Sequence, residues 1–134
     1  RRAVRGNAVV VGDAGGFVKP TTGGGVAIGG AVARMAGRAA AETALLGRPL
    51  TAFEDRWRKA FEKEFNTMRL AARIFRNMSG FEMESALGEI GRLDLLNAVA
   101  GYDFDLQRAT VNRAIRSRLG VYAVLPLVRS IFER

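Results

Sequence analysis

From residue 25 onward, apolar side chains recur at every third or fourth position, and this spacing restricts the chain to a largely helical fold. The spacing is strongest over residues 51–78, where basic residues avoid the apolar stripe. Because aromatic stripes with helical spacing usually pack in a core, we expect these side chains to be buried rather than to line a tunnel for an apolar ligand. The stripe contains Phe53, Trp57, Phe61, Phe65, Met68, Ala72 and Phe75, and the residues expected to face solvent include Arg69, Arg73 and Arg76.

Local signals divide this helical region into segments. Residues Thr51–Glu54 and Ser79–Glu82 each have the spacing of a capping box, in which an N-cap hydroxyl and a later Glu satisfy each other's backbone N–H groups. Together with the intervening glycines and prolines, they predict five or six helices. The expected helices lie at roughly 26–46, 51–78, 81–90, 92–100, 105–118 and 120–133.

The first of these helices is expected to have a face of small residues. Such a face allows another backbone to approach closely. Its members are Val26, Gly29, Gly30, Ala33, Gly37, Ala40, Ala41 and Ala44.

A single strand is expected near the N-terminus, at residues 8–12. The run at 8–11 is apolar and mostly β-branched, and Gly6-Asn7 and Gly12-Asp13 bound it. Since no second strand pattern follows, the strand is expected to stay unpaired, to pair with a second copy, or to join a sheet encoded outside this sequence. The isolated chain is therefore predicted to be mostly α.

Composition excludes several kinds of chemistry. The sequence has no Cys and no His, so it offers no disulfide, no Cys/His zinc site, no thiol nucleophile and no histidine base, and no metal site is expected. The absence of Cys fits a reducing compartment, and we expect a cytoplasmic chain. No apolar run reaches the length of a membrane span, although residues 119–132 could touch a membrane surface peripherally.

The net charge of +8 favours anionic partners. A helical module that binds anionic membranes or nucleic acid through this charge is therefore one open hypothesis. Nucleic acid is not the expected partner, because the basic residues alternate with acids and form no ladder with aromatic residues.

The segment after the strand, residues 12–25, is the part of the sequence that suggests a binding site. Gly12-Asp13 would project a carboxylate from the end of the strand, where ligands bind in strand–helix folds. The triple glycine at 23–25 leads into a helix, whose free N–H groups and partial positive charge suit an anion or an electron-rich ring edge. The segment is neither a Walker loop nor a Gly-x-Gly-x-x-Gly turn.

Residues 12–26, with Gly37 and Ala40-Ala41 beyond them, resemble the late flavin-binding segment of the geranylgeranyl reductase family. These are FAD-dependent enzymes that saturate isoprenoid double bonds of lipids and prenyl side chains. The resemblance is close over residues 8–46 and loose afterwards. It implies that residues 1–48 are the C-terminal segment of an α/β FAD-binding domain of the glutathione-reductase type, and that residues 49–134 are a helical C-terminal region.

The resemblance also implies the site. In the family, the aspartate that matches Asp13 hydrogen-bonds the ribityl chain of FAD, and the backbone around Gly24 and Gly25 faces the pyrimidine edge of the flavin. The implied cofactor-binding residues are Gly12, Asp13, Ala14, Gly15, Pro20, Gly23, Gly24 and Gly25, and no side chain is a clear proton donor. Flavin monooxygenases and halogenases share this layout, so one of these enzymes is the alternative.

The implied partners are a polyprenyl lipid or prenyl-chain substrate and a reductant such as NAD(P)H or ferredoxin. The family's Gly-x-Gly-x-x-Gly start, which binds the ADP half of FAD, has no counterpart in this sequence. We therefore expect the chain alone to bind FAD poorly and to be inactive.

Overall fold

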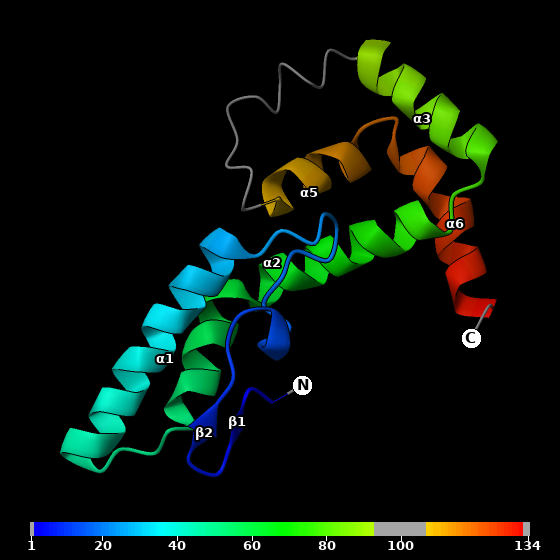
Figure 1. Cartoon of the computed structure of the whole chain (residues 1–134). Helices are drawn as coiled ribbons and strands as arrows, with labels where there is room; N and C mark the ends of the chain where they lie inside the picture. Colours follow the sequence, from blue (N-terminus) through cyan, green and yellow to red (C-terminus); the bar gives the residue numbers. More distant parts are fainter. Residues whose placement is uncertain (1, 93–106, 133–134) are drawn as a thin grey trace. The chain divides into compact units, whose positions relative to one another are not determined.

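The computed structural model describes residues 2–92 and 107–132 (Figure 1). The chain divides into two compact units, residues 1–65 and residues 66–134. The described residues form five α-helices and one short sheet, which confirms the prediction of a mostly helical chain. The helices are α1 (Val26–Leu46), α2 (Ala52–Arg76), α3 (Gly80–Arg92), α5 (Arg108–Arg116) and α6 (Gly120–Phe132). Most of the helix expected at 92–100 lies outside the described residues.

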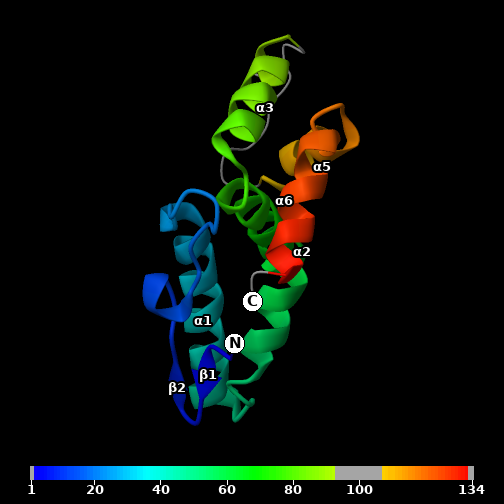
Figure 2. The same ribbon diagram turned by 90° about the vertical axis from the view of Figure 1, so that its right-hand side faces the viewer.

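The expected strand exists, but it is shorter than predicted and finds its partner within the chain. β2 (Ala8–Val9) pairs antiparallel with β1 (Val4–Arg5), and both are visible in Figure 2. The expectation that the strand could stay unpaired is therefore wrong. The reason is the two-residue turn at Gly6-Asn7, because a tight hairpin needs a positive φ that Gly6 supplies at 58°.

The buried face of α1 differs from the predicted one. Its buried residues are Ile28, Gly29, Val32, Ala36 and Ala39, whereas the small residues Gly30, Ala33, Gly37, Ala40 and Ala44 are exposed. Burying the larger aliphatic side chains removes more apolar area from water, which favours the face that contains Ile28 and Val32. The predicted face of close approach is thus open in this chain.

The apolar stripe of α2 is largely core, as expected. Phe53, Phe65, Met68 and Ala72 are buried, and Trp57 and Phe61 are half-buried. Phe75 departs from the prediction, since it is 53% exposed. Arg69, Arg73 and Arg76 are exposed, as their positions outside the stripe predicted.

In the second unit, an ion pair connects α6 with the start of α3. The Ser79–Glu82 capping box forms as predicted: the Ser79 N–H donates to Glu82 Oε2 at 2.7 Å, and the Glu82 N–H donates to Ser79 Oγ at 3.3 Å. Arg129 Nη1 also donates to Glu82 Oε2, at 2.8 Å, and to the Asn77 carbonyl at 3.2 Å. The hydrogen bonds from Ser79 and the guanidinium of Arg129 hold the pKa of Glu82 below its usual value.

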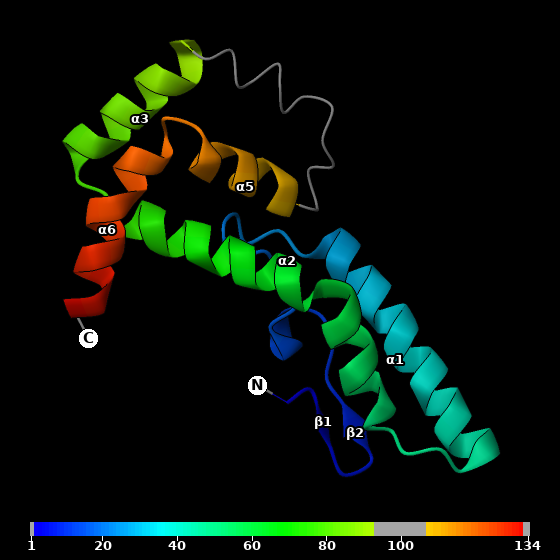
Figure 3. The same ribbon diagram turned by 180° about the vertical axis from the view of Figure 1, so that it is seen from behind.

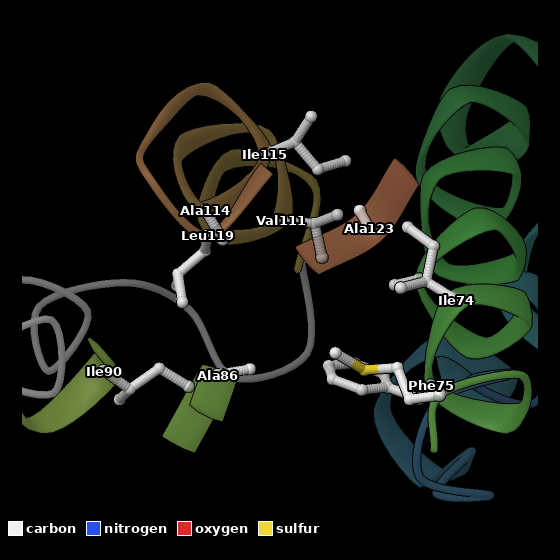
Figure 4. A pocket seen from close by; sticks show the side chains of 11 residues that line it. Ile74, Phe75, Ala86, Ile90, Val111, Ala114, Ile115, Leu119 and Ala123 are labelled. Atoms are coloured by element: carbon white, nitrogen blue, oxygen red, sulfur yellow. The ribbon is translucent and has the colours of Figure 1, made fainter. Parts of the chain in front are cut away.

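The same unit contains an apolar pocket of about 120 Å³ (Figure 4). Ile74 and Phe75 of α2 lie on one side of it, and residues of α3, α5 and α6 complete it. The other lining residues are Ala71, Met78, Ala86, Ile90, Val111, Ala114, Ile115, Leu119 and Ala123. Among residues 2–92 and 107–132, no helix is both long and apolar enough to cross a bilayer.

Candidate functional site

The candidate site is the loop between β2 and α1, both of which appear from behind in Figure 3. The loop starts with a 3₁₀ turn, η1 (Asp13–Gly15), which is closed by the Phe17 N–H donating to the Gly12 carbonyl at 2.9 Å. Gly12 has φ 65° and ψ −151°, a conformation essentially restricted to glycine. The chain therefore needs a glycine here to turn from the hairpin into Asp13.

Asp13 lies beside the N-terminus of α1. A methyl group added at Gly25 would lie 3.2 Å from Asp13 Oδ1 and 2.9 Å from Val18 Cγ1, so a side chain at this position would collide with the loop. Gly25 is the N-cap of α1 and supplies no side-chain hydrogen bond. The first N–H groups of α1 thus have no intrahelical partner, and they lie next to an exposed carboxylate.

The second half of the loop is a turn around Pro20. The Lys19 N–H donates to the Gly24 carbonyl at 2.9 Å, and the Gly23 N–H donates to the Lys19 carbonyl at 2.9 Å. A methyl group added at Gly24 would meet the Lys19 side chain, with its Cε at 3.1 Å. Gly24 therefore faces side-chain atoms of the buried Lys19 and, at 3.6 Å, Oγ1 of Thr22.

The structure brings most of the predicted site residues into this one loop, but Gly15 has a different surrounding. A methyl group added at Gly15 would lie 2.7 Å from the Val10 carbonyl oxygen and 2.8 Å from the Phe17 ring. The missing side chain of Gly15 thus makes room for Phe17. Ala14, beside it in η1, is exposed.

Phe17 anchors the loop to α2, and the sequence analysis missed it. Phe17 is 3% exposed. Its ring makes edge-to-face contacts with three aromatic rings, with centroid-to-centroid distances of 5.2 Å to Trp57, 6.2 Å to Phe53 and 6.3 Å to Phe65. Each such pair adds about 0.5–1.5 kcal/mol beyond burial. The available signal was a large aromatic residue within a segment otherwise rich in small residues.

Glu54 was also misassigned, because its carboxylate does not form the predicted capping box with Thr51. It accepts hydrogen bonds from the N–H groups of Ala3 and Val4 and from the Trp57 indole. Partial burial opposes ionisation of Glu54, but the hydrogen bonds from Trp57, Val4 and Ala3 outweigh it and lower its pKa. A long-range partner has replaced the local one.

A second carboxylate, Glu42, joins α1 to α2. Its Oε2 atom accepts a hydrogen bond from Arg56 of α2, and Arg38 and Arg48 also pair with it. The hydrogen bond from Arg56 is the largest cause that lowers the pKa of Glu42, to about 2. This ion-pair network keeps α1, which begins at the candidate site, against α2.

No group of three or more acidic residues placed to hold a metal ion is present among the described residues. The loop offers hydrogen-bond acceptors in the Asp13 carboxylate and its backbone carbonyls, and hydrogen-bond donors in its backbone N–H groups. This set suits an organic ligand with hydroxyls and an electron-rich edge.

Two curated relatives match the chain, and each is named digeranylgeranylglycerophospholipid reductase 2. The protein from Methanopyrus kandleri is 35% identical over 97 residues, which are 69% of this chain and 24% of that protein. The protein from Methanothermobacter thermautotrophicus is 35% identical over 91 residues, which are 65% of this chain and 24% of that protein. No protein-family model matches, and no solved structure matches at the same level of significance.

The names of these relatives agree with the resemblance of residues 12–26 to reductases that act on isoprenoid lipids. The chain is related to the geranylgeranyl reductase family, and its resemblance to that family is confirmed. The chain spans about a quarter of the length of the curated relatives that it matches.

Proposed function

We propose that this chain is part of an FAD-dependent oxidoreductase of the geranylgeranyl reductase type. Residues 1–48 would be the last segment of its FAD-binding domain, and residues 49–134 its helical C-terminal region. The observation that carries the proposal is the position of the Asp13 carboxylate beside Gly25, at a helix N-terminus that no side chain caps.

The residues of the loop fit the riboflavin half of FAD. The Asp13 carboxylate can accept hydrogen bonds from ribityl hydroxyls, while the first N–H groups of α1 can donate to the pyrimidine edge. Without a Cβ at Gly24 and Gly25, the backbone can lie directly against a flat ring. The remaining proposed binding residues, which shape the two turns of the loop, are Gly12, Ala14, Gly15, Pro20 and Gly23.

When bound, FAD would supply the hydride that saturates an isoprenoid double bond. This chain would contribute position: Asp13 orients the ribityl chain, and the N-terminus of α1 favours the negative charge of the reduced ring. The names of the relatives support a prenyl lipid substrate, and NAD(P)H or ferredoxin is the proposed reductant. Contact with a membrane surface would suit such a substrate.

The test is to express the complete reading frame that contains this chain and to record its visible absorbance. We expect the spectrum of bound flavin, and we expect the variant Asp13→Ala to lose it at constant salt. The sequence encoded upstream should contain a nucleotide-binding strand–helix start. A protein without flavin absorbance, or an upstream region without that start, would contradict the proposal.

The net charge of +8 supports a second candidate, a helical module that binds anionic surfaces. Its binding to an anionic polymer should fall steeply as salt rises, because counterions are released on binding. Asp13→Ala should leave such binding unchanged or strengthen it, since the variant removes a negative charge. The two candidates therefore differ in their response to one substitution.

A further inference from the structure

One carboxylate connects two separate parts of the first unit. Glu54 lies in the first turn of α2, and its side chain is only 14% exposed. Its Oε1 atom accepts hydrogen bonds from the N–H groups of Ala3 and Val4, the latter at 3.0 Å. Its Oε2 atom accepts one from Trp57 Nε1 at 2.9 Å. Each oxygen thus holds a different segment.

The first connection leads through the hairpin to Asp13. Ala3 and Val4 begin the hairpin, and Val4 pairs with Val9 of β2. The Val10 N–H donates to the Ala3 carbonyl at 2.9 Å, so the pairing continues beyond β2. Gly12 and Asp13 follow the hairpin directly. The position of β1 therefore determines the position of the Asp13 backbone.

The second connection leads through Trp57 to Phe17. The hydrogen bond to Glu54 orients the Trp57 indole. Arg58 lies over the indole, with its Cζ 4.7 Å from the ring centroid, and its Nη2 donates to Glu54 Oε2 at 3.4 Å. The oriented ring contacts Phe17 edge to face at 5.2 Å. Asp13 begins the η1 turn and Phe17 lies two residues beyond its last residue, so the two connections hold the chain on both sides of that turn.

We propose that Glu54 is a positioning residue for the ligand loop: it holds β1 through one oxygen and Trp57 through the other, and so sets the place of Asp13 beside the N-terminus of α1. This inference rests on the proposed function, in which the loop binds the riboflavin half of FAD. Glu54 acts through the hairpin and Trp57.

The test compares Glu54→Gln with Glu62→Gln. In Glu54→Gln the amide oxygen can still accept from Ala3 and Val4, but the NH₂ group then faces the indole N–H, and Trp57 loses its acceptor. Glu62 is a matched control, because it lies on the same helix and pairs with the same Arg58 at 3.1 Å, yet its side chain is 45% exposed.

Two measurements are needed. In the product of the complete reading frame, the FAD dissociation constant should rise about tenfold for Glu54→Gln, equivalent to about 1.4 kcal/mol, and should change less than about twofold for Glu62→Gln. In the 134-residue chain, Trp57 is the sole tryptophan, and its emission should shift to longer wavelength for Glu54→Gln alone. A merely structural role would lower the unfolding temperature without changing the dissociation constant measured well below it.

The outcomes separate the inference from the proposed function. If Asp13→Ala releases FAD while Glu54→Gln binds it as the wild type does, the inference is wrong and the proposed function stands. If neither variant changes FAD binding, both are wrong. If Glu54→Gln does not fold, Trp57→Phe takes its place, since it keeps a ring against Phe17 and removes the indole N–H. Trp57→Phe should raise the dissociation constant about fivefold, or about 1 kcal/mol, and an unchanged value would overturn the inference.

Discussion

Gly24 and Gly25 are adjacent in sequence, but their surroundings make them different tests of the loop. A methyl group at Gly25 would meet Val18 at 2.9 Å and the Phe17 carbonyl oxygen at 3.2 Å, so any substitution there distorts the loop itself. At Gly24 it would lie 3.1 Å from Lys19 Cε and 3.6 Å from Thr22 Oγ1, which are side-chain atoms and not backbone atoms of the loop. Gly24→Val should therefore disturb the loop less than a substitution at Gly25 would, and it should obstruct a ligand lying against the loop.

We expect Gly24→Val to abolish flavin retention in the complete protein and to leave the far-ultraviolet circular dichroism of the helices unchanged. Flavin absorbance after gel filtration measures the first effect. Gly30→Ala is the control, because a methyl group at Gly30 points into open space. If Gly24→Val retained FAD and turned over normally, the glycine segment would be a linker and the proposed site would be wrong.

Glu42 makes stability depend on pH in the acid range. Its pKa is lowered to about 2 in the folded chain from an ordinary value of 4.5, chiefly by the hydrogen bond from Arg56. A group with a lowered folded-state pKa stabilises the fold above its unfolded pKa and loses that contribution as pH falls. The contribution of Glu42 should thus be complete at neutral pH and disappear between about pH 4.5 and pH 2.

Urea unfolding midpoints measure this contribution. Glu42→Gln should lower the midpoint at neutral pH and should unfold more like the wild type near pH 2. Arg56→Gln should reproduce the neutral-pH loss, whereas Arg38→Gln should have little effect, because the Arg38 side chain is 79% exposed. A midpoint difference that stayed constant over this pH range would contradict the assignment.

At the level of elements, the two helix starts that share a capping-box spacing should respond differently to loss of the hydroxyl. Ser79 exchanges hydrogen bonds with Glu82, whereas Glu54 is committed to Ala3, Val4 and Trp57. Ser79→Ala should therefore destabilise the second unit by about 1 kcal/mol, the usual cost of a lost cap. Thr51→Ala should change stability by less than about 0.5 kcal/mol. Chemical denaturation of both variants measures the difference. Equal losses of stability would contradict the assignment that only the Ser79–Glu82 capping box forms.

For the whole molecule, exposed apolar side chains predict self-association of the isolated chain. Val26 is 94% exposed and Leu45 81% exposed at the two ends of α1, and the small-residue face between them is also open. Exposed apolar side chains of this size commonly mediate association. We expect the sedimentation coefficient to rise with concentration, and the rise to be smaller for Leu45→Gln than for the control Arg69→Gln. A monomer at all concentrations would contradict this expectation.

The helix boundaries followed from the sequence alone, because they depend on residues close together in the chain. The helix predicted at 26–46 is α1, and the Ser79–Glu82 box forms between residues three positions apart. The order of Gly12, Asp13 and the triple glycine was likewise enough to indicate the family resemblance, which the two relatives confirm, while ligand binding by this loop stays a prediction.

Only the tertiary structure decided which residues hold that loop. Local spacing assigned Glu54 to Thr51, but in the folded chain Glu54 accepts the N–H of Val4, 50 positions away, and Phe17 packs against Trp57. The sequence pattern also placed the small residues of α1 on a packed face, yet the larger Ile28 and Val32 are buried. In each case a contact between distant segments removed more apolar area from water, or satisfied more buried polar groups, than the local alternative could. A local sequence pattern does not show which of the two is more favourable.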